Sequence, residues 1–369
     1  MPEHFRGFAA VVERDGGTTY ATICRGVADN EDVLGLLNAA PPAQARPLLL
    51  LGAVHFLLLS GVQHPLAAHY DTVAATLGSP PQTPTTDVTA AFISFCHDFR
   101  PALTELIATR RTQTNEVGRC TALLPGLCHI AALQPDAGPL SLLDLGTSAG
   151  LNLLFDDYGY TYREPDADAV RRAGVPGARV ALSCTARSGL GLLPDLQLPP
   201  MAARVGLDLS PVDPQSDDEA LWLLACQWPD NPVRFANVRA AIDNVRAAAH
   251  PPRLVQGDMV EDLARVAATV TGEGPLVVFH SWVAAYLGED RQRALVEAVR
   301  AVGQERPVHY LYAESAFETV GLPTPPPPQP RPGPDMATAL VHVAPGSEPA
   351  RIADMHPHGY WLRWWPPPV

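Results

Sequence analysis

The sequence predicts an α/β protein with two parts. Residues 1–138 form a helical N-terminal part, and residues 139–369 form a doubly wound, mostly parallel sheet with a small β insertion at about 158–200. Two observations predict this class. Apolar residues recur at helical spacing in the first part, and short strand-like runs alternate with longer helical runs from about residue 140. A chain of 369 residues with 47% apolar content is long enough to bury a core in each part.

The first part shows five helical patterns separated by turn-forming residues such as "GSPPQTPTTD" at 78–87. They cover residues 31–41, 45–62, 64–78, 88–110 and 115–134. The most apolar run, "PLLLLGAVHFLLLSGV" at 47–62, is too short to span a bilayer and contains His55. We therefore expect a buried helix there. Because the start of the chain also lacks a signal-peptide pattern, we expect a cytoplasmic protein.

In the second part, each strand-like run is followed by a helical run, which predicts parallel pairing through right-handed crossovers. The strands are expected at 141–146, 203–210, 252–259, 274–281 and 306–315, and the helices at 149–158, 217–227, 232–249, 260–270 and 288–303. Short strand patterns at 158–163 and 178–184 predict the β insertion. A polyproline loop at 321–335 and three antiparallel strands at the sheet edge, at 337–345, 350–356 and 359–365, are expected to close the chain.

Composition excludes several classes of function. The net charge of −13 argues against nucleic acid or an anionic membrane as the main partner. All 26 basic residues are arginine, and a chain without lysine has neither a Walker phosphate loop nor a pyridoxal-phosphate Schiff base. The six cysteines show no zinc-finger spacing, so we expect reduced, buried thiols and no metal.

A polar residue ends every predicted strand of the sheet. These residues are Asp144, Asp208, Asp258, His280 and Glu314. In an open α/β sheet, ligands bind beyond the carboxyl ends of the strands, near the point where the strand order reverses. The repetition over five strands therefore predicts a ligand cleft at this edge.

The first strand leads into "DLGTSAGLN", in which Gly146, Ser148 and Gly150 alternate and Asn152 follows. Glycines let the backbone turn tightly and approach a ligand, and a following helix offers free N–H groups. The spacing G-x-x-x-G does not fit the dinucleotide fingerprint. With acids at the next two strand ends, it resembles the pattern of class I S-adenosylmethionine-dependent methyltransferases. That resemblance implies that Asp144 and the turn bind the methionine part of the cofactor, Asp208 the ribose and Asp258 the adenine region.

Six ordered motifs carry a closer resemblance, which covers nearly the whole chain. They are "QTNEVGR" at 113–119, "GTSAGLNL" at 146–153, "GLDLSPVDP" at 206–214, "QWPD" at 227–230, "VVFHSWVAAYL" at 277–287 and "HPHGYWLRWW" at 356–365. They look like the signatures of a bacterial family catalogued as domain of unknown function 2332. The resemblance implies a Rossmann-like, methyltransferase-like core behind a helical N-terminal part, and it names no substrate.

Several further residues are candidates for this site. Asn115, Glu116 and Arg119 either cap a helix or lie over the glycine turn, where they would bind the charged ends of the cofactor or substrate. His280 is either a packed core residue or a general base, and Tyr286 would line the same pocket.

The same choice between structure and function applies to the histidine-containing "DMHPHGYW" at 354–361 and to Glu314. For the first we expect a hairpin turn rather than a metal site. Glu314 is the alternative catalytic candidate if His280 is structural.

The favoured hypothesis is a methyltransferase that uses S-adenosyl-L-methionine to modify a small molecule. Three alternatives stay open. The first is a nicotinamide-dependent oxidoreductase, which the glycine spacing disfavours. The second is a nucleoside-binding or scaffold protein that kept the fold without the chemistry, and the third is a different reaction of the same cofactor.

Overall fold

The computed structural model describes residues 1–78, 80, 84–165, 167–329 and 338–365. The chain forms two compact units. We call Met1–Thr114 with Asp213–Arg239 the helical unit, and Asn115–Val212 with Ala240–Val369 the sheet unit. The predicted boundary after residue 138 thus differs from the observed division after Thr114. The reason is that the helix α8, Cys120–Leu133, packs on strands of the sheet unit.

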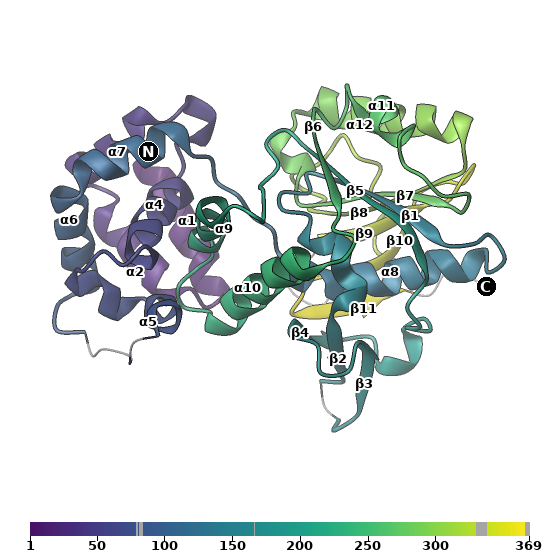
Figure 1. Ribbon diagram of the computed structural model, residues 1–369, viewed down its shortest axis with the longest axis horizontal. Helices are drawn as coiled ribbons and strands as arrows, with labels where there is room; N and C mark the ends of the chain where they lie inside the picture. The colour runs from purple at the N-terminus through teal and green to yellow at the C-terminus, as the bar shows by residue number, and fades with distance from the viewer. Residues whose placement is uncertain (79, 81–83, 166, 330–337, 366–369) are drawn as a thin grey trace. The chain divides into compact units, whose positions relative to one another are not determined.

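The helical unit is built around α4, Pro47–Leu59, which is buried along nearly its whole length (Figure 1). Its other helices are α1 (Pro2–Arg14), α2 (Thr18–Val27), α3 (Glu31–Leu34), α5 (Asp71–Leu77), α6 (Val88–Asp98), α7 (Arg100–Thr109) and α9 (Asp217–Ala225). The buried His55 of α4 is satisfied, because its ring nitrogens lie 3.0 Å from the Ala225 carbonyl oxygen and 2.8 Å from Thr72 Oγ1. No described helix, α4 included, is long and apolar enough to cross a membrane.

The sheet unit contains one mixed sheet of eleven strands in the order β3-β2-β4-β11-β10-β9-β8-β7-β1-β5-β6. The strands are β1 (Leu140–Leu145), β2 (Gly159–Arg163), β3 (Val170–Gly174), β4 (Ala181–Ala186), β5 (Met201–Asp208), β6 (Arg253–Gln256), β7 (Leu276–Ser281), β8 (Val308–Glu314), β9 (Thr338–Val343), β10 (Ala350–Met355) and β11 (Trp361–Trp364). The five strands predicted from apolar runs, β1 and β5 to β8, pair in parallel. The chain order reverses between the neighbours β1 and β7, which is where a cleft is expected.

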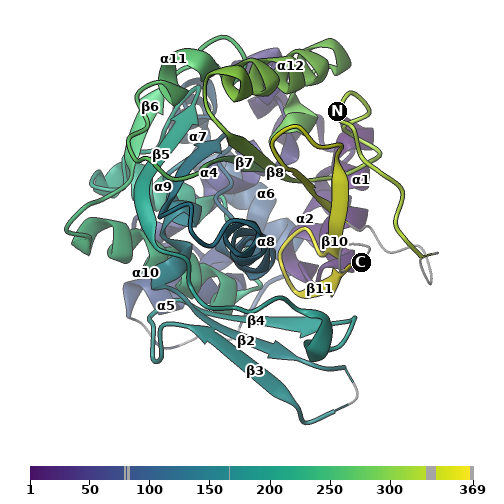
Figure 2. The same cartoon turned by 90° about the vertical axis from the view of Figure 1, so that its right-hand side faces the viewer.

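Helices cover both faces of the sheet (Figure 2). The helix α8 packs on β4, β9 and β10. On the other face, α11 (Leu263–Ala267) and α12 (Glu289–Glu305) pack on an apolar core that includes Leu143, Val278 and Tyr310. The coarse prediction, an α/β protein with a large, mostly parallel sheet, is therefore confirmed.

Three of the differences between the structure and the predicted elements concern residues 139–369. The expected helix at 149–158 is a short, kinked 3-10 helix, η5 (Leu151–Asp157). The helices predicted at 217–227 and 232–249 do not both pack on the sheet as crossover helices. Instead, α9 and the first half of α10, Pro232–Ala247, belong to the helical unit. The C-terminal strands are not at the sheet edge, because β11 pairs in parallel with β4 and thereby joins the insertion to the sheet.

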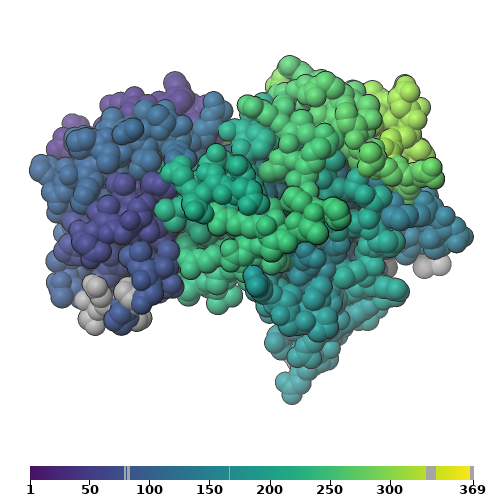
Figure 3. All heavy atoms as spheres, in the orientation of Figure 1, coloured from purple at the N-terminus to yellow at the C-terminus, as the bar shows by residue number. Residues whose placement is uncertain are grey.

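The insertion is a three-stranded extension of the sheet. Strand β2 pairs in parallel with β4 and antiparallel with β3, which the sequence patterns did not predict. The hairpin of β2 and β3 projects from the surface of the sheet unit (Figure 3). The polyproline loop predicted at 321–335 lies within the described residues only as far as residue 329.

Candidate functional site

The turn after β1 is held in an unusual backbone conformation. Gly146, Ser148 and Gly150 all have left-handed φ angles, of 71°, 53° and 72°. Such angles cost a glycine little, but they are uncommon for a residue with a Cβ atom, such as Ser148. Strained residues of this kind collect at ligand-binding and catalytic sites.

Gly146 is required by packing as well as by its φ angle. A Cβ atom at this position would lie 2.3 Å from Cγ2 of Val283, in the loop after β7. We therefore expect Gly146→Ala to destabilise the protein by about 1–3 kcal/mol through strain and overpacking. Chemical denaturation of Gly146→Ala and of the double variant Gly146→Ala/Val283→Ala measures this effect. Recovery of stability in the double variant identifies the clash, and equal stability of Gly146→Ala and the wild type would contradict the packing argument.

Asp208, at the end of β5, connects this strand to the turn after β1 through hydrogen bonds. Its Oδ2 atom accepts a hydrogen bond from the Ser148 N–H at 2.9 Å, and its Oδ1 atom accepts one from the Ser210 N–H at 2.8 Å. Accepting the Ser148 N–H fixes the left-handed residue in place. Each carboxylate oxygen keeps further acceptor capacity, so the arrangement leaves Asp208 able to bind a hydroxyl group as well.

Asp144 is a buried acid at the base of the turn. Its side chain is 4% exposed, and its Oδ2 atom accepts a hydrogen bond from Thr147 Oγ1 at 2.9 Å. Burial raises the pKa of Asp144 to about 8, and the nearby Asp208 carboxylate acts in the same direction. The strand therefore ends in a carboxyl group that holds its proton at neutral pH in the ligand-free protein. A cation beside it would favour the ionised form.

The segment before α8 lies directly on the turn. The Oδ1 atom of Asn115 accepts a hydrogen bond from the Leu151 N–H at 3.1 Å. Arg119 is buried and donates from Nη1 to the Ser281 carbonyl oxygen at 2.9 Å and from Nε to the Pro357 carbonyl oxygen at 3.0 Å. Four segments far apart in the sequence thus meet at the ends of β1 and β7.

Glu116 joins the C-terminal hairpin to the same place. Its carboxylate accepts the Gly118 N–H at 3.0 Å and lies 3.0 Å from Nδ1 of His358. Gly118 has no space for a side chain, because a Cβ atom would lie 2.3 Å from the His358 carbonyl oxygen. The predicted hairpin turn at "HPHGYW" is therefore a packing partner of the "TNEVGR" segment, and Glu116 is buried between them.

His280 and Glu314 form a buried hydrogen-bonded chain with Tyr310. Nδ1 of His280 lies 2.7 Å from Oε1 of Glu314, and Nε2 lies 2.7 Å from the Tyr310 hydroxyl. The same Glu314 oxygen accepts the N–H groups of Val283 and Ala284 at 2.9 and 3.1 Å. Both ring nitrogens of His280 are engaged, and the residue is 0% exposed. Glu314 thus accepts the first N–H groups of the loop after β7, and His280 in turn contacts Glu314.

The chain matches the bacterial protein family described as "Uncharacterized protein conserved in bacteria (DUF2332)" over residues 2–364. The chain belongs to this family. Comparisons with curated proteins and with solved structures gave no match.

Five of the six motifs that resemble this DUF2332 family meet at the strand ends described above. The sixth, "QWPD", lies in the helical unit. There Oδ1 of Asp230 accepts the Thr19 N–H at 3.0 Å and so caps α2. The six motifs therefore lie in two separate parts of the chain. Only the motifs of the sheet unit form the candidate site.

The remaining residues predicted for the candidate site have other partners. Asp258 accepts the Val260 N–H at 2.8 Å and pairs with Arg291 of α12 at 2.6 Å. Asn152 is buried and accepts a hydrogen bond from the Cys120 thiol at 3.4 Å. Tyr286 is exposed, so it lies on the surface of the loop after β7.

Sequence reasoning missed two residues of the candidate site, Trp282 and Tyr310. Trp282 has a φ of 54° directly after β7, and its indole N–H donates to Thr338 Oγ1 at 2.8 Å. A bulky residue in this conformation is a genuine outlier, which the sequence alone does not reveal. The sequence does contain a pattern that could have identified Tyr310. Tyr310, Tyr312 and Glu314 occupy alternate positions along β8 and so share one face of the strand.

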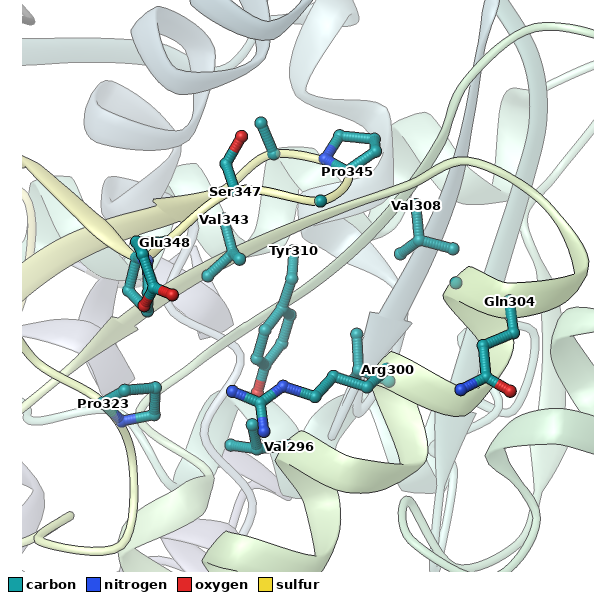
Figure 4. A pocket seen from close by; sticks show the side chains of 15 residues that line it. Val296, Arg300, Gln304, Val308, Tyr310, Pro323, Val343, Pro345, Ser347 and Glu348 are labelled. Atoms are coloured by element: carbon teal, nitrogen blue, oxygen red, sulfur yellow. The ribbon is translucent and has the colours of Figure 1, made fainter.

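A hollow of about 290 Å³ lies elsewhere in the sheet unit, between α12 and the strands β8 and β9 (Figure 4). Tyr310 lies among its lining side chains, which also include Arg300 and Glu348. Because it adjoins Val308, where β8 begins, it lies away from the carboxyl ends of the strands. Among the described residues, no group of three or more histidine, cysteine or acidic side chains is arranged to hold a metal ion.

Proposed function

We propose that this protein binds S-adenosyl-L-methionine at the carboxyl ends of β1, β5 and β7 and transfers its methyl group to a small molecule. The observation that carries the proposal is the pair of strained, non-glycine residues, Ser148 and Trp282, that follow the strands on either side of the strand-order reversal. Strain at the expected ligand position is a mark of a functional site rather than of an ordinary connection.

The residues present fit such a cofactor in three respects. The parallel strands follow the order β6-β5-β1-β7-β8, which corresponds to the nucleotide-binding order of doubly wound sheets. Asp208 ends the second strand of that series, where an acid that binds ribose hydroxyls is expected. Asp144 is a buried carboxyl beside the turn, and its raised pKa suits a partner that arrives with positive charge.

The cofactor would supply an electrophilic methyl group, so the protein has little covalent chemistry to do. Its residues would hold and orient the reactants and exclude water. In this proposal the turn from Gly146 to Gly150 and Asp144 face the charged methionine part, and Asp208 faces the ribose.

Other residues of the site would support this arrangement. Asp258 borders the adenine region with Arg291 held against it. The segment before α8 would hold the turn in place. Asn115 contacts Leu151, Glu116 contacts His358, and Arg119 contacts Ser281.

His280 then acts by position rather than as the base that accepts the proton of the nucleophile. Its two ring nitrogens bind Glu314 and Tyr310, and Glu314 in turn holds the Val283 and Ala284 N–H groups. Because the candidate base is occupied in this way, a nucleoside-binding protein without turnover is the second candidate. Catalytic turnover separates that candidate from a methyltransferase.

Calorimetric titration with S-adenosylmethionine, S-adenosylhomocysteine and NAD tests the proposal. We expect both sulfur compounds to bind and NAD not to bind. Binding of NAD alone would replace the proposal with the oxidoreductase alternative, and failure of all three compounds to bind would reject a nucleoside site. Consumption of S-adenosylmethionine with a cell extract as the source of acceptor then decides between an enzyme and a binding protein.

Asp208→Ala is expected to weaken S-adenosylhomocysteine binding by roughly tenfold to a hundredfold. The variant removes the acceptor for the ribose hydroxyls and for the Ser148 N–H, and an unpaired buried donor costs about 1–3 kcal/mol. The matched control is Asp195→Ala, which removes an exposed acid of the insertion. Equal affinity of Asp208→Ala and the wild type would remove Asp208 from the cofactor site.

A further inference from the structure

Two loops at the carboxyl ends of β7 and β8 carry the most exposed apolar side chains of the sheet unit. Among the residues that the structure describes in this unit, the three most exposed large apolar side chains are Phe317 at 82%, Val320 at 64% and Tyr286 at 63%. The next, Leu209 at 57%, follows β5 at the same edge. Exposed apolar side chains that gather in one place mark binding surfaces, whereas scattered ones need no explanation.

A buried glutamine joins the two loops. The side-chain amide of Gln292, on α12, donates to the carbonyl oxygens of Ala284, Leu287 and Glu318 at 3.1, 3.0 and 3.2 Å. Its Oε1 atom accepts the Gly321 N–H at 2.8 Å. We call residues 282–287 and 315–321, joined in this way, the two-loop platform.

The platform is anchored to the sheet at its base. Glu314 ends β8 and accepts the Val283 and Ala284 N–H groups, and the Trp282 N–H donates to the Ala313 carbonyl oxygen at 3.0 Å. These contacts hold the exposed side chains on a fixed frame, which lowers the entropy lost when a ligand binds. The platform is also continuous with the candidate site, because Val283 packs against Gly146.

We infer that the two-loop platform binds the molecule that accepts the methyl group, and that this molecule is planar and aromatic. That the bound molecule is the methyl acceptor rests on the proposed function. That the platform is a binding surface rests only on the exposed side chains and on the contacts of Gln292 and Glu314 described above. Two of the three exposed side chains, Tyr286 and Phe317, are aromatic, and aromatic rings bind flat rings by offset stacking or edge-to-face contact. The branched side chain of Val320 adds apolar area without a charge.

The test compares the binding of 2-naphthol with that of its saturated analogue, decahydro-2-naphthol, to the full chain by ligand-detected NMR. We expect 2-naphthol to bind more tightly than the saturated molecule. Phe317→Ala is expected to weaken 2-naphthol binding by roughly threefold to tenfold. Leu192→Ala, which removes an exposed apolar side chain of the insertion, is the matched control and should bind 2-naphthol as the wild type does. The melting temperature of each variant verifies that it is folded.

Three outcomes would overturn the inference. The first is equal binding of the two probes, and the second is 2-naphthol binding that Phe317→Ala leaves unchanged. The third is a dimer in sedimentation velocity that Phe317→Ala dissociates, since the platform would then be a contact between two copies of the chain. Titration of the wild type with S-adenosylhomocysteine, run on the same preparation, tests the proposed cofactor separately. A protein that binds 2-naphthol at the platform but not S-adenosylhomocysteine would retain the aromatic site and lose the methyltransferase proposal.

Discussion

Replacing Asp144 by asparagine is expected to stabilise the ligand-free protein at neutral and alkaline pH. The folded carboxyl has a pKa of about 8 because it is buried, against 3.8 as its ordinary value. The protonated form is thus favoured by folding, and its contribution is fully present below pH 3.8 and is lost as the pH rises through 8. At roughly 1.4 kcal/mol per pKa unit, the loss amounts to several kcal/mol above pH 8. Asparagine avoids it and still accepts the hydrogen bond from Thr147 Oγ1.

Urea denaturation of the wild type and of Asp144→Asn at about pH 5, 7 and 8.5 measures this effect. The difference in unfolding free energy should grow in favour of the variant as the pH rises. Parallel stability curves across this range would show that Asp144 does not titrate as proposed. The same variant should bind S-adenosylhomocysteine more weakly, because it cannot supply a negative charge to the ammonium group. Higher stability together with weaker binding is the result expected when an acid that serves function is replaced.

Removal of the Glu314 carboxylate is expected to cost about 3–5 kcal/mol of stability, because each buried donor left without an acceptor costs about 1–3 kcal/mol. Glu314→Ala leaves the Val283 and Ala284 N–H groups and Nδ1 of His280 without their shared acceptor. The loop after β7 should loosen, so that S-adenosylhomocysteine binding falls together with the melting temperature.

Glu314→Gln separates geometry from charge in this network. Its amide oxygen can still accept the two backbone N–H groups, so we expect a smaller loss of stability than in Glu314→Ala. Glu297→Ala, on the exposed face of α12, is the control for the loss of an acid from the unit. A Glu314→Ala variant less than about 1 kcal/mol below the wild type would contradict the assigned role, because unpaired buried donors normally cost more.

The parallel strands were predictable because their signal is local. Each is an apolar run that ends in a polar residue, as in "LVVFHS" of β7, and such runs are typical of strands buried on both faces. The polar residues at the strand ends also follow from sequence, since carboxyl ends of parallel strands share one edge. Asp144 and Asp208 were therefore expected at the same edge of the sheet from the sequence alone.

The helix predicted after the glycine turn is instead the short 3-10 helix η5, because side chains take the backbone groups at its start. Leu151, Leu154 and Phe155 are buried, and their spacings of three and four residues suit an α-helix. The Leu151 carbonyl oxygen, which would accept the Phe155 N–H in an α-helix, accepts from the Tyr158 hydroxyl at 2.6 Å. The Leu151 N–H, which an α-helix would leave without a partner in the helix, donates to Asn115. Periodicity is assessed within about one helical segment. It cannot show that Asn115, 36 positions earlier, accepts the Leu151 N–H.

The role of His280 was open for a related reason. Its place at the end of a strand suggested a group facing a cleft, but strand ends do not reveal which face a side chain occupies. In the structure it stacks on Tyr312 at 5.6 Å between ring centroids, and Tyr312 belongs to the buried core that α12 covers. The parallel register that brings His280 opposite Tyr312 depends on the pairing of β7 with β8.

The pairing of β11 with β4 determines when this sheet can be completed during synthesis. The Trp364 N–H bonds to Ser188 Oγ across 176 residues, so β2 to β4 leave the ribosome long before the strand that joins them to the rest of the sheet. Closing so long a loop slows folding, and the edge of β4 stays open until residues 361–364 arrive. A nascent chain that stops short of Trp361 would present that edge to other chains, and an open strand edge is a site of aggregation.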